Sequence, residues 1–427
     1  MHTPTNVGAK NLSPIHLNRC TMERSGKDYV LFGKGGQFLP QEEMLEVRKR
    51  KNNLTIGIPR ETTYQENRVA LAPEAVAVLV NNGHKVIIES DAGANAFFPD
   101  QDYAEAGGDL VHGHEEVFKA HIILKVAPLT DKELTYVKPG QVVFSTLALP
   151  MQKEDYFKAL MNKKVTAAAF EFIRDKTKNF PLVRSMSEIA GNTAILIASE
   201  YLCDKKYGKG RMFGGFSGIT PTEVVILGAG TVGEYAVRAA MGLGAMVKVF
   251  DNSIYKLRRL QNNLNTRIFT SIIQPKVLLK ALKTADVVVG AIHSSWGRTP
   301  VVVTEEMVGQ MKYGSVIVDV SIDQGGCVET SEVTNHTDPV FKKYGVTHYC
   351  VPNIASKVPH TASYAFSNFF VPVLLSMGDG GGIENLLKQD AGIRQGIYLF
   401  NGTLTKQYIG ESFGLSYQDI DLLMAAF

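Results

Sequence analysis

The sequence predicts an α/β protein with two doubly wound parallel-sheet domains, and three observations support this fold class. Short apolar strands alternate with helical segments from Leu54 onward, which is typical of βαβ units. A second series of the same kind begins near residue 220, at EVVILGAGTVG. Finally, 427 residues with 45% hydrophobic and 20% charged side chains suit a globular protein of two or three domains.

The first strand–helix series follows an extension, residues 1–53, in which we expect only a short helix near 41–50. Pro73 suits the first turn of a helix, and Gly83 suits the position just after its end. Another helix is expected around residues 100–106. The expected strands are LTIGIP, HKVIIE, HIILKV and QVVFST.

In the second series, the strands AMVKVFD, DVVVGAI and SVIVDVSI hardly alternate between apolar and polar residues, so we expect them to be buried. Beyond residue 355 the pattern is helical. The uncharged stretch Thr361 to Gly378 contains Ser, Asn and Pro, which predicts a buried helix and not a membrane span.

The polar tail after these helices has no partner strand close to it in sequence, so we expect it to pack back on the first domain. This predicts a nucleotide-binding domain, residues 183–358, inserted between two parts of a substrate domain. The two parts are residues 54–182 and 359–427.

Charge argues against a nucleic-acid partner. The net charge is +3. Residues 1–53 hold nine basic and five acidic residues, whereas the rest of the chain holds 36 basic and 37 acidic ones. A near-neutral body lacks the positive surface that binds phosphate backbones, and the basic run at 48–51 reads as a solvated helix end.

The cysteine pattern suggests a reducing compartment. The four cysteines form no C-x-x-C pair, so the sequence signals neither a zinc knuckle nor a disulfide framework. The N-terminal residues also lack the apolar core of a secretory signal. We therefore expect a cytoplasmic protein.

A glycine fingerprint predicts a dinucleotide site. Gly228, Gly230 and Gly233 follow the strand VVIL and open a helix, so a pyrophosphate could approach the backbone at the helix N-terminus. Asp251 ends the next strand, where a carboxylate would bind a ribose 2′-hydroxyl and repel a 2′-phosphate. NAD is therefore favoured over NADP, although Lys256 would soften that repulsion. A Gly-rich turn without a ligand is the alternative for the glycines alone.

Two cations in the first series could hold a small carboxylate. Arg68 lies in the loop QENRV between a strand and a helix, and Lys125 ends the strand HIILKV. The carboxyl ends of parallel strands meet at one edge of a sheet, so both side chains are candidates for one mouth. Arginine could grip a carboxylate through two hydrogen bonds. A surface charge or a salt bridge is the alternative for each.

Other polar residues invite separate interpretations. Asp323, followed by Gln and two glycines after the strand SVIVDV, suits either a loop facing a cofactor or a turn cap. Asp319, inside that strand, is expected to be buried and hydrogen-bonded. His112 and His114 could suggest a metal, but no acid or Cys pattern supports one, and a solvated loop is expected.

These segments in this order resemble the alanine dehydrogenase family, whose fold is shared by the nucleotide-binding subunit of proton-translocating transhydrogenases. The resemblance runs from about Leu54 to Gly402. It is carried by IGIPRE with ENRVALAPEAV, HKVIIESDAGANAFF, ILKVAPL, PLVRSMSEIAG, VVILGAGTVG, MVKVFD, GSVIVDVSIDQGGCVETS and HYCVPNIASKVPHTASYA.

The resemblance implies an NAD-dependent oxidoreductase that interconverts L-alanine with pyruvate and ammonia, usually as a homohexamer. It implies that Arg68 and Lys125 hold the substrate carboxylate and that Asp323 lies beside the reacting carbon. The residues that it places at the cofactor, besides the glycines, are Ser187, Asp251, Lys256 and Asn353.

One position departs from the family pattern. The resemblance implies a catalytic His where this chain has Ala148, and alanine can neither transfer a proton nor polarise a carbonyl oxygen. His293, at the end of DVVVGAI, could supply a proton from the nucleotide domain, and a polar loop residue is the alternative.

Two further functions stay open. A transhydrogenase-like subunit would carry an Arg-x-Gln-x-x-Asp loop, but Gln and Asp are missing after Arg184. A non-catalytic NAD-binding sensor is compatible with Ala148, whereas the retained Arg68, Lys125 and Asp323 favour the dehydrogenase.

Overall fold

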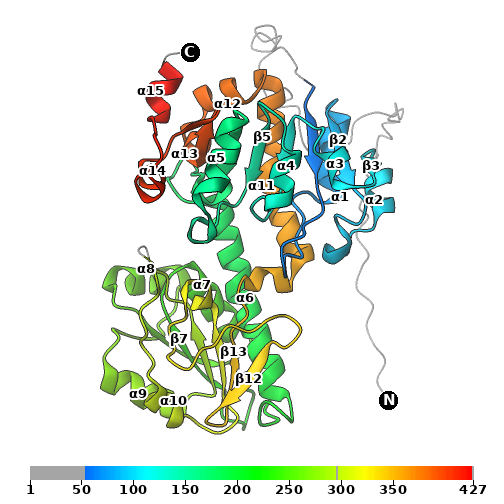
Figure 1. The fold of residues 1–427 in the computed structure, drawn as a ribbon. Helices are drawn as coiled ribbons and strands as arrows, with labels where there is room; N and C mark the ends of the chain where they lie inside the picture. The colour runs from blue at the N-terminus through cyan, green and yellow to red at the C-terminus, as the bar shows by residue number, and fades with distance from the viewer. Residues whose placement is uncertain (1–52, 295–296, 426–427) are drawn as a thin grey trace, which may run out of the picture. The chain divides into compact units, whose positions relative to one another are not determined.

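The computed structural model describes residues 53–294 and 297–425, which belong to one compact unit. In these residues an eight-stranded sheet and a seven-stranded sheet, both mostly parallel, are each covered by helices (Figure 1). The predicted α/β class with two sheets is therefore confirmed. The expected helix near 41–50 and nearly all of the N-terminal extension lie outside the described residues.

The first sheet has the strand order β15-β14-β6-β5-β4-β1-β2-β3. Its strands are β1 (Thr55–Ile58), β2 (Lys85–Glu89), β3 (Asp109–Val111), β4 (Ile122–Leu124), β5 (Val142–Ser145), β6 (Thr166–Ala169), β14 (Ile397–Phe400) and β15 (Thr403–Leu404). Its helices are α1 (Pro73–Asn81), α2 (Asp100–Glu105), α3 (His114–Val117), α4 (Asp131–Tyr136), α5 (Glu154–Asn162), α11 (Pro359–Gly380), α12 (Ile383–Gln389), α13 (Ala391–Gly396), α14 (Gln407–Phe413) and α15 (Ile420–Ala425).

The second sheet has the order β12-β13-β11-β10-β7-β8-β9. Its strands are β7 (Glu223–Leu227), β8 (Met246–Phe250), β9 (Phe269–Ser271), β10 (Val287–Gly290), β11 (Val316–Asp319), β12 (Val340–Lys343) and β13 (Val346–Tyr349). The helices of this part are α6 (Pro181–Cys203), α7 (Thr231–Gly242), α8 (Ile254–Leu264), α9 (Pro275–Thr284) and α10 (Glu305–Gly309).

In both sheets the order of the strands reverses at the first strand in sequence, β1 or β7. The neighbours of β1 are β2 and β4, and the neighbours of β7 are β8 and β10. A point where the strand order reverses leaves a crevice beyond the carboxyl ends of the strands, because the crossover helices leave on opposite faces. The two crevices are therefore the expected positions of ligands.

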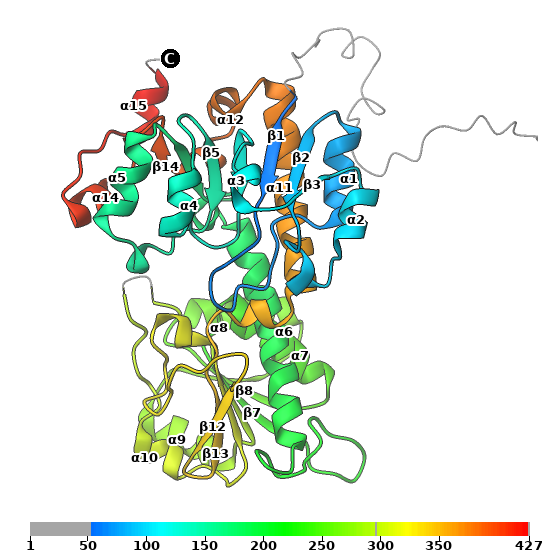
Figure 2. The same ribbon diagram turned by 45° about the vertical axis from the view of Figure 1, so that its right-hand side comes forward.

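Successive residues of the first sheet's strands face opposite layers of helices. Leu124 and Val126 pack in the core that contains α1 and α11, whereas Ile123 packs in the core that contains α3, α4 and α5. Figure 2 shows these two groups of helices around the strands. This alternation decides which side of the sheet a strand-end side chain can reach.

Each of the two mostly parallel sheets also contains antiparallel strand pairing at one edge. The tail returns to the first sheet as predicted, but it does so as β14, which pairs antiparallel with β6, and as β15, which pairs antiparallel with β14. In the second sheet β12 also runs antiparallel to β13. Strand β6 was not predicted from the sequence, because three of its four residues are alanine, which has low strand propensity.

Candidate functional site

A pocket of about 320 Å³ brings together residues that follow strands of both sheets and residues of α6. It includes five of the residues that the sequence singled out, namely Arg68, Ser187, His293, Asp323 and Asn353. Apolar side chains such as Met186 complete its walls. This size and lining suit a small organic molecule held by a few polar groups.

The guanidinium of Arg68 is held in place from one edge. Its Nε and Nη2 donate to the two carboxylate oxygens of Glu66 at 2.7 and 2.6 Å, and its Nη1 donates to Met186 Sδ at 3.4 Å. The group also lies over the Phe366 ring, 5.4 Å from its centroid. Although burial opposes the charged form, the Glu66 carboxylate raises the pKa of Arg68.

Glu66 occupies only the Nε edge of Arg68. A guanidinium carries five N–H groups, so the edge formed by Nη1 and Nη2 keeps donors with no carboxylate partner among the described residues. A ligand carboxylate could bind that edge through two hydrogen bonds without displacing Glu66. Glu66 itself was not singled out from the sequence, although an acid two residues before a candidate arginine is a usable signal.

Asn353 connects Glu66 to Asp323. Its side-chain Nδ2 donates to Glu66 Oε2 at 3.1 Å, and its backbone N–H donates to Asp323 Oδ1 at 2.7 Å. Asn353 adopts a left-handed φ of 54°, which asparagine tolerates better than most residues. Asp323 lines the pocket and is exposed to solvent there, while the protein atoms around its carboxyl partly desolvate it and raise its pKa.

The glycine turn after β7 has the shape that a dinucleotide phosphate needs. Gly228 has φ +109°, and a Cβ there would lie 2.3 Å from Ala291 O. A Cβ on Gly233 would lie 2.0 Å from Gly228 O, so helix α7 can approach the strand only with glycine. A Cβ on Gly230 would meet nothing within 4 Å, which leaves open space above the helix N-terminus.

A second pocket, of about 180 Å³, lies at this turn and includes Gly228, Gly230, Asp251 and Lys256. The Asp251 carboxylate accepts N–H groups from Ala229 at 2.8 Å and from Ser253 at 2.7 Å. These bonds fix the carboxylate at the end of β8, where it can still accept from a ribose hydroxyl. The residues present therefore fit the phosphate and ribose of a dinucleotide.

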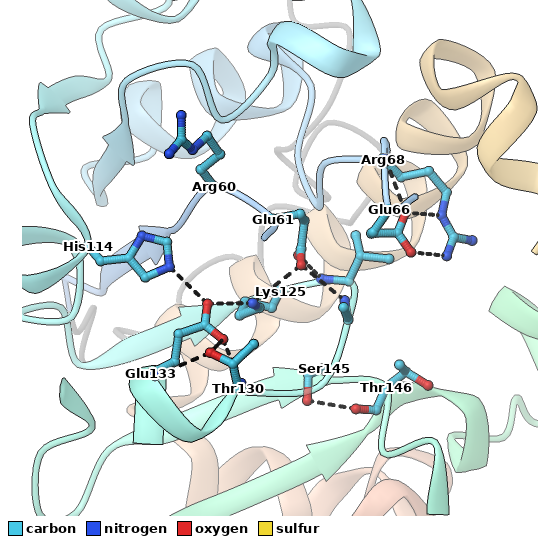
Figure 3. Close-up of polar contacts among 12 residues, drawn as sticks. Arg60, Glu61, Glu66, Arg68, His114, Lys125, Thr130, Glu133, Ser145 and Thr146 are labelled. Carbon is cyan, nitrogen blue, oxygen red and sulfur yellow. Dashed lines mark hydrogen bonds and ion pairs between the residues drawn. The ribbon is translucent and has the colours of Figure 1, made fainter. Parts of the chain in front are cut away.

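Lys125 does not join Arg68. It is absent from the described residues that line the Arg68 pocket, and its side chain is 0% exposed. Its Nζ lies 2.5 Å from Glu133 Oε1 and 3.3 Å from Glu61 Oε2, as Figure 3 shows. The expectation of two cations at one mouth is not met in this structure.

The cause is the alternation of side chains along β4. Lys125 follows Leu124 and so shares the face of Ile123, which packs with α3 and α4. Arg68 contacts Met186 of α6 and Phe366 of α11 on the other side. The carboxyl ends of strands do meet at one edge, but two residues there can still face opposite layers.

The histidine pair of the first domain also differs from expectation. His112 is exposed as predicted, but His114 is only 14% exposed and lies between Glu89, at 2.6 Å, and Glu133, at 3.0 Å. Hydrogen bonds to these two carboxylates raise the pKa of His114 to about 9. In the described part of the chain, no group of three His, Cys, Asp or Glu side chains could hold a metal ion.

The strand end that carries Ala148 keeps a defined conformation. Ala148 has a left-handed φ of 46°, and its N–H donates to Glu171 Oε1 at 3.3 Å. The N–H of Leu147 donates to the same oxygen at 2.7 Å. Glu171 therefore holds the loop in place, although position 148 itself offers only the methyl group of alanine.

Asp319 behaves as the sequence suggests. It is 1% exposed and accepts hydrogen bonds from the backbone N–H groups of Ser321 and Cys327 and from the Ser331 hydroxyl. These bonds shape the loop that carries Asp323. The role of Asp319 is therefore to position that loop.

Comparison with known proteins places the fold and the site in context. Family profiles described as "Alanine dehydrogenase/PNT, N-terminal domain" and "Alanine dehydrogenase/PNT, C-terminal domain" match residues 57–190 and 194–407. An alanine dehydrogenase of Staphylococcus saprophyticus is 37% identical over 369 residues, 86% of this chain and 99% of the relative. An alanine dehydrogenase of Staphylococcus haemolyticus is 36% identical, over 86% of this chain and 98% of the relative.

Solved structures agree. An L-alanine dehydrogenase superposes with a TM-score of 0.78 at 34% identity and covers 84% of this chain and 99% of that one. A transhydrogenase from Sinorhizobium meliloti, at 24% identity, shares the fold with a TM-score of 0.70 over 83% of this chain and 99% of that one. Within the described residues, no helix is long and apolar enough to cross a membrane.

Proposed function

The chain belongs to the alanine dehydrogenase/PNT family, and we propose that it is an NAD-dependent amino-acid dehydrogenase that interconverts L-alanine with pyruvate and ammonia. One observation carries the proposal most directly. Arg68, whose Nη1 and Nη2 groups have more N–H donors than Glu66 and Met186 use, lines one pocket together with Asp323. The segment Ala291 to His293 lines both that pocket and the one at the glycine turn. A small carboxylate and a dinucleotide could therefore meet there.

The roles follow from the contacts. Arg68 holds the substrate carboxylate through Nη1 and Nη2, while Glu66 fixes the guanidinium from behind. Asp323, held by Asn353, faces the substrate in the same pocket. NAD, when bound, accepts the hydride from the substrate α-carbon. Lys125 stays a predicted carboxylate ligand from the family resemblance, but its buried ion pairs favour a structural role.

The cofactor assignment rests on the end of β8. The Asp251 carboxylate would accept a ribose 2′-hydroxyl and repel a 2′-phosphate, which favours NAD, while Lys256 in the same pocket weakens the repulsion. We assign nucleotide binding to residues 183–358 and substrate binding to residues 54–182 with 359–427. Ser187 lines the pocket from α6, on the side where we place the cofactor.

The test is a screen of NADH consumption with ammonium and a panel of 2-oxo acids. We expect turnover with pyruvate above the other oxo acids and faster oxidation of NADH than of NADPH. Preference for a bulkier oxo acid would reassign the substrate but keep the reaction class. No oxidation with any member of the panel, by a protein that binds NADH, would reject the proposal.

A second function is supported by two observations, namely the methyl group at Ala148 and the burial of Lys125. Without an imidazole at position 148 and without the Lys125 ammonium in the pocket, the protein could bind NAD and an amino acid but not catalyse their reaction. It would then act as a sensor. NAD and L-alanine binding in calorimetry, without NADH formation over hours, would favour this sensor.

Assembly and location are two further proposals. We propose a homo-oligomer, a hexamer by family resemblance, because large apolar side chains such as Leu196, Phe216 and Ile219 are 55–60% exposed. Light scattering after size exclusion would measure the mass. A cytoplasmic location fits the unpaired thiols of Cys203, Cys327 and Cys350.

A further inference from the structure

The pocket proposed for the substrate contains one imidazole. The charged or titratable side chains that line it are Arg68, Asp323 and His293. Arg68 keeps its proton throughout the range in which proteins fold. Asp323 accepts a backbone hydrogen bond from Asn353, and its pKa is raised by desolvation but starts from the low value of a carboxyl. His293 alone starts from a value near neutrality.

The backbone around His293 is held by hydrogen bonds, whereas its side chain has no partner among the described residues. The N–H of Ile292 donates to Ser321 Oγ at 2.9 Å, and the N–H of Ser294 donates to Gln324 Oε1 at 2.9 Å. In residues 53–294 and 297–425, no hydrogen-bond or ion-pair partner is seen for the His293 imidazole. A fixed backbone with unpaired ring nitrogens is the arrangement expected of a group that serves a ligand.

His293 also stands where the two ligands would meet. It follows β10, the strand next to β7 at the reversal of strand order in the second sheet. It lines the pocket of Arg68 and also the pocket of the glycine turn. The charged residues that share these two pockets with it are Lys256 of α8, Asp251 after β8, Asp323 after β11 and Arg68. The His293 side chain is exposed to solvent, and partial desolvation and Lys256 lower the pKa of its ring, which favours the neutral form that can accept a proton.

We propose that His293 is a catalytic acid–base residue of the dehydrogenase reaction, and this rests on the proposed function. In the oxidative direction an N–H bond of the substrate ammonium breaks, and its proton moves to the neutral imidazole. The freed electron pair forms the C=N bond as hydride leaves the α-carbon with its own electron pair for the dinucleotide. Water then adds to the carbon of the C=N bond, ammonia leaves, and the imidazolium passes its proton to solvent. In reverse, the imidazolium donates to the oxygen of the 2-oxo acid.

The first experiment compares His293→Gln with His112→Gln, which removes an exposed imidazole that contacts only Ser90 Oγ, at 2.9 Å. We expect kcat to fall about 10²–10⁴-fold in His293→Gln, with NAD affinity unchanged and His112→Gln like wild type. In His293→Ala, added imidazole should restore part of the rate. A His293→Gln enzyme as fast as wild type would overturn the proposal and leave the dehydrogenase function standing.

The second experiment needs no turnover. We would measure pyruvate affinity for the enzyme–NADH complex without ammonium from pH 5 to 8. Because only imidazolium can donate to the oxo group, affinity should fall as pH rises in wild type and stay flat in His293→Gln. Equal pH dependence in both proteins would reject the role of His293. If wild type turns over no oxo acid, the proposed function fails and the catalytic role of His293 fails with it, and the binding measurement then tests only whether the imidazole contacts the oxo group.

Discussion

Lys125 Nζ lies 2.5 Å from Glu133 Oε1, on the face of the first sheet that α3 and α4 cover. Both side chains are almost completely excluded from solvent. The ammonium is thereby neutralised inside the protein. The chain of contacts continues through His114 to Glu89 and, on the other side, to Glu61. This ion network holds together the ends of β1, β2 and β4 and leaves Arg68 as the cation of the substrate pocket.

Lys125→Met tests whether this lysine stabilises the fold or binds substrate. Removing one partner of a buried ion pair leaves an uncompensated charge, so we expect the free energy of unfolding to fall by about 3–5 kcal/mol in urea titrations. Lys119→Met is the matched control, because Lys119 and Glu116 form an exposed ion pair, and it should cost under about 1 kcal/mol. A stable Lys125→Met enzyme with a selectively raised KM for pyruvate would instead support the carboxylate role.

Arg68→Lys tests the proposed carboxylate anchor. Lysine keeps the positive charge beside Glu66 but cannot offer a second pair of donors to a ligand. We expect KM for 2-oxo acids to rise at least about tenfold, the equivalent of roughly 1.5 kcal/mol, with NAD affinity unchanged. Arg60→Lys is the control, because Arg60 also follows β1 and its side chain is exposed. Unchanged oxo-acid kinetics in Arg68→Lys would contradict the assignment.

Asp251→Asn tests the choice of cofactor. The change keeps the size of the side chain but removes the negative charge. Because Ala229 and Ser253 donate to different carboxylate oxygens, the amide oxygen can keep only one of these two hydrogen bonds. The ratio of NAD to NADP affinity should shrink by about tenfold, as expected for one lost charge-assisted hydrogen bond. Titration of both nucleotides by protein fluorescence gives this ratio. A wild type that binds NADP as tightly as NAD would already disprove the role of Asp251.

Ala148→His tests whether the position can regain a proton-transfer group. Histidine tolerates the left-handed backbone found there, and a positioned acid–base group typically contributes about 10²–10⁴-fold. If His293 moves the proton, as proposed above, Ala148→His should leave the rate with pyruvate and ammonium unchanged or lower it. A slow wild type that Ala148→His accelerates would instead show that the proton-transfer group is missing at position 148. Ala148→Gly is the control, since it should leave the rate unchanged and relieve the left-handed strain. A fast wild type that Ala148→His does not improve would show that the position is not needed.

The pH dependence of stability should report His114. The pKa of His114 is raised to about 9 in the folded protein, so its contribution is complete below about 6.5 and is lost as pH rises through 9. Burial also raises the pKa of Glu61 to about 7, which lowers stability as pH rises from 4.5 to 7. The midpoint of urea unfolding should therefore decline from pH 6.5 to 9. The decline should flatten in His114→Gln, and an equal decline there would exclude His114 as its source.

The sequence by itself determined the parts of this protein that depend on local pattern. The apolar runs predicted β1, β5, β7 and β11, and the glycine spacing predicted the turn before α7, because burial and backbone conformation impose those residues wherever the segment lies. The class of fold, the return of the tail to the first sheet and the positions of Arg68 and Asp323 after strands followed from the same patterns.

The tertiary structure decided which side chains meet. Lys125 and Arg68 both follow strands of one sheet, yet the alternation along β4 sends Lys125 to α4, while Arg68 packs against Phe366 of α11. The pairing of Glu66 with Arg68 and the place of His293 in two pockets also required the fold. The spacing of apolar residues along the chain determines which residues of a strand share a face. The residues that such a face contacts are far away in sequence, and these contacts decide whether a charged side chain binds a ligand or forms a buried ion pair.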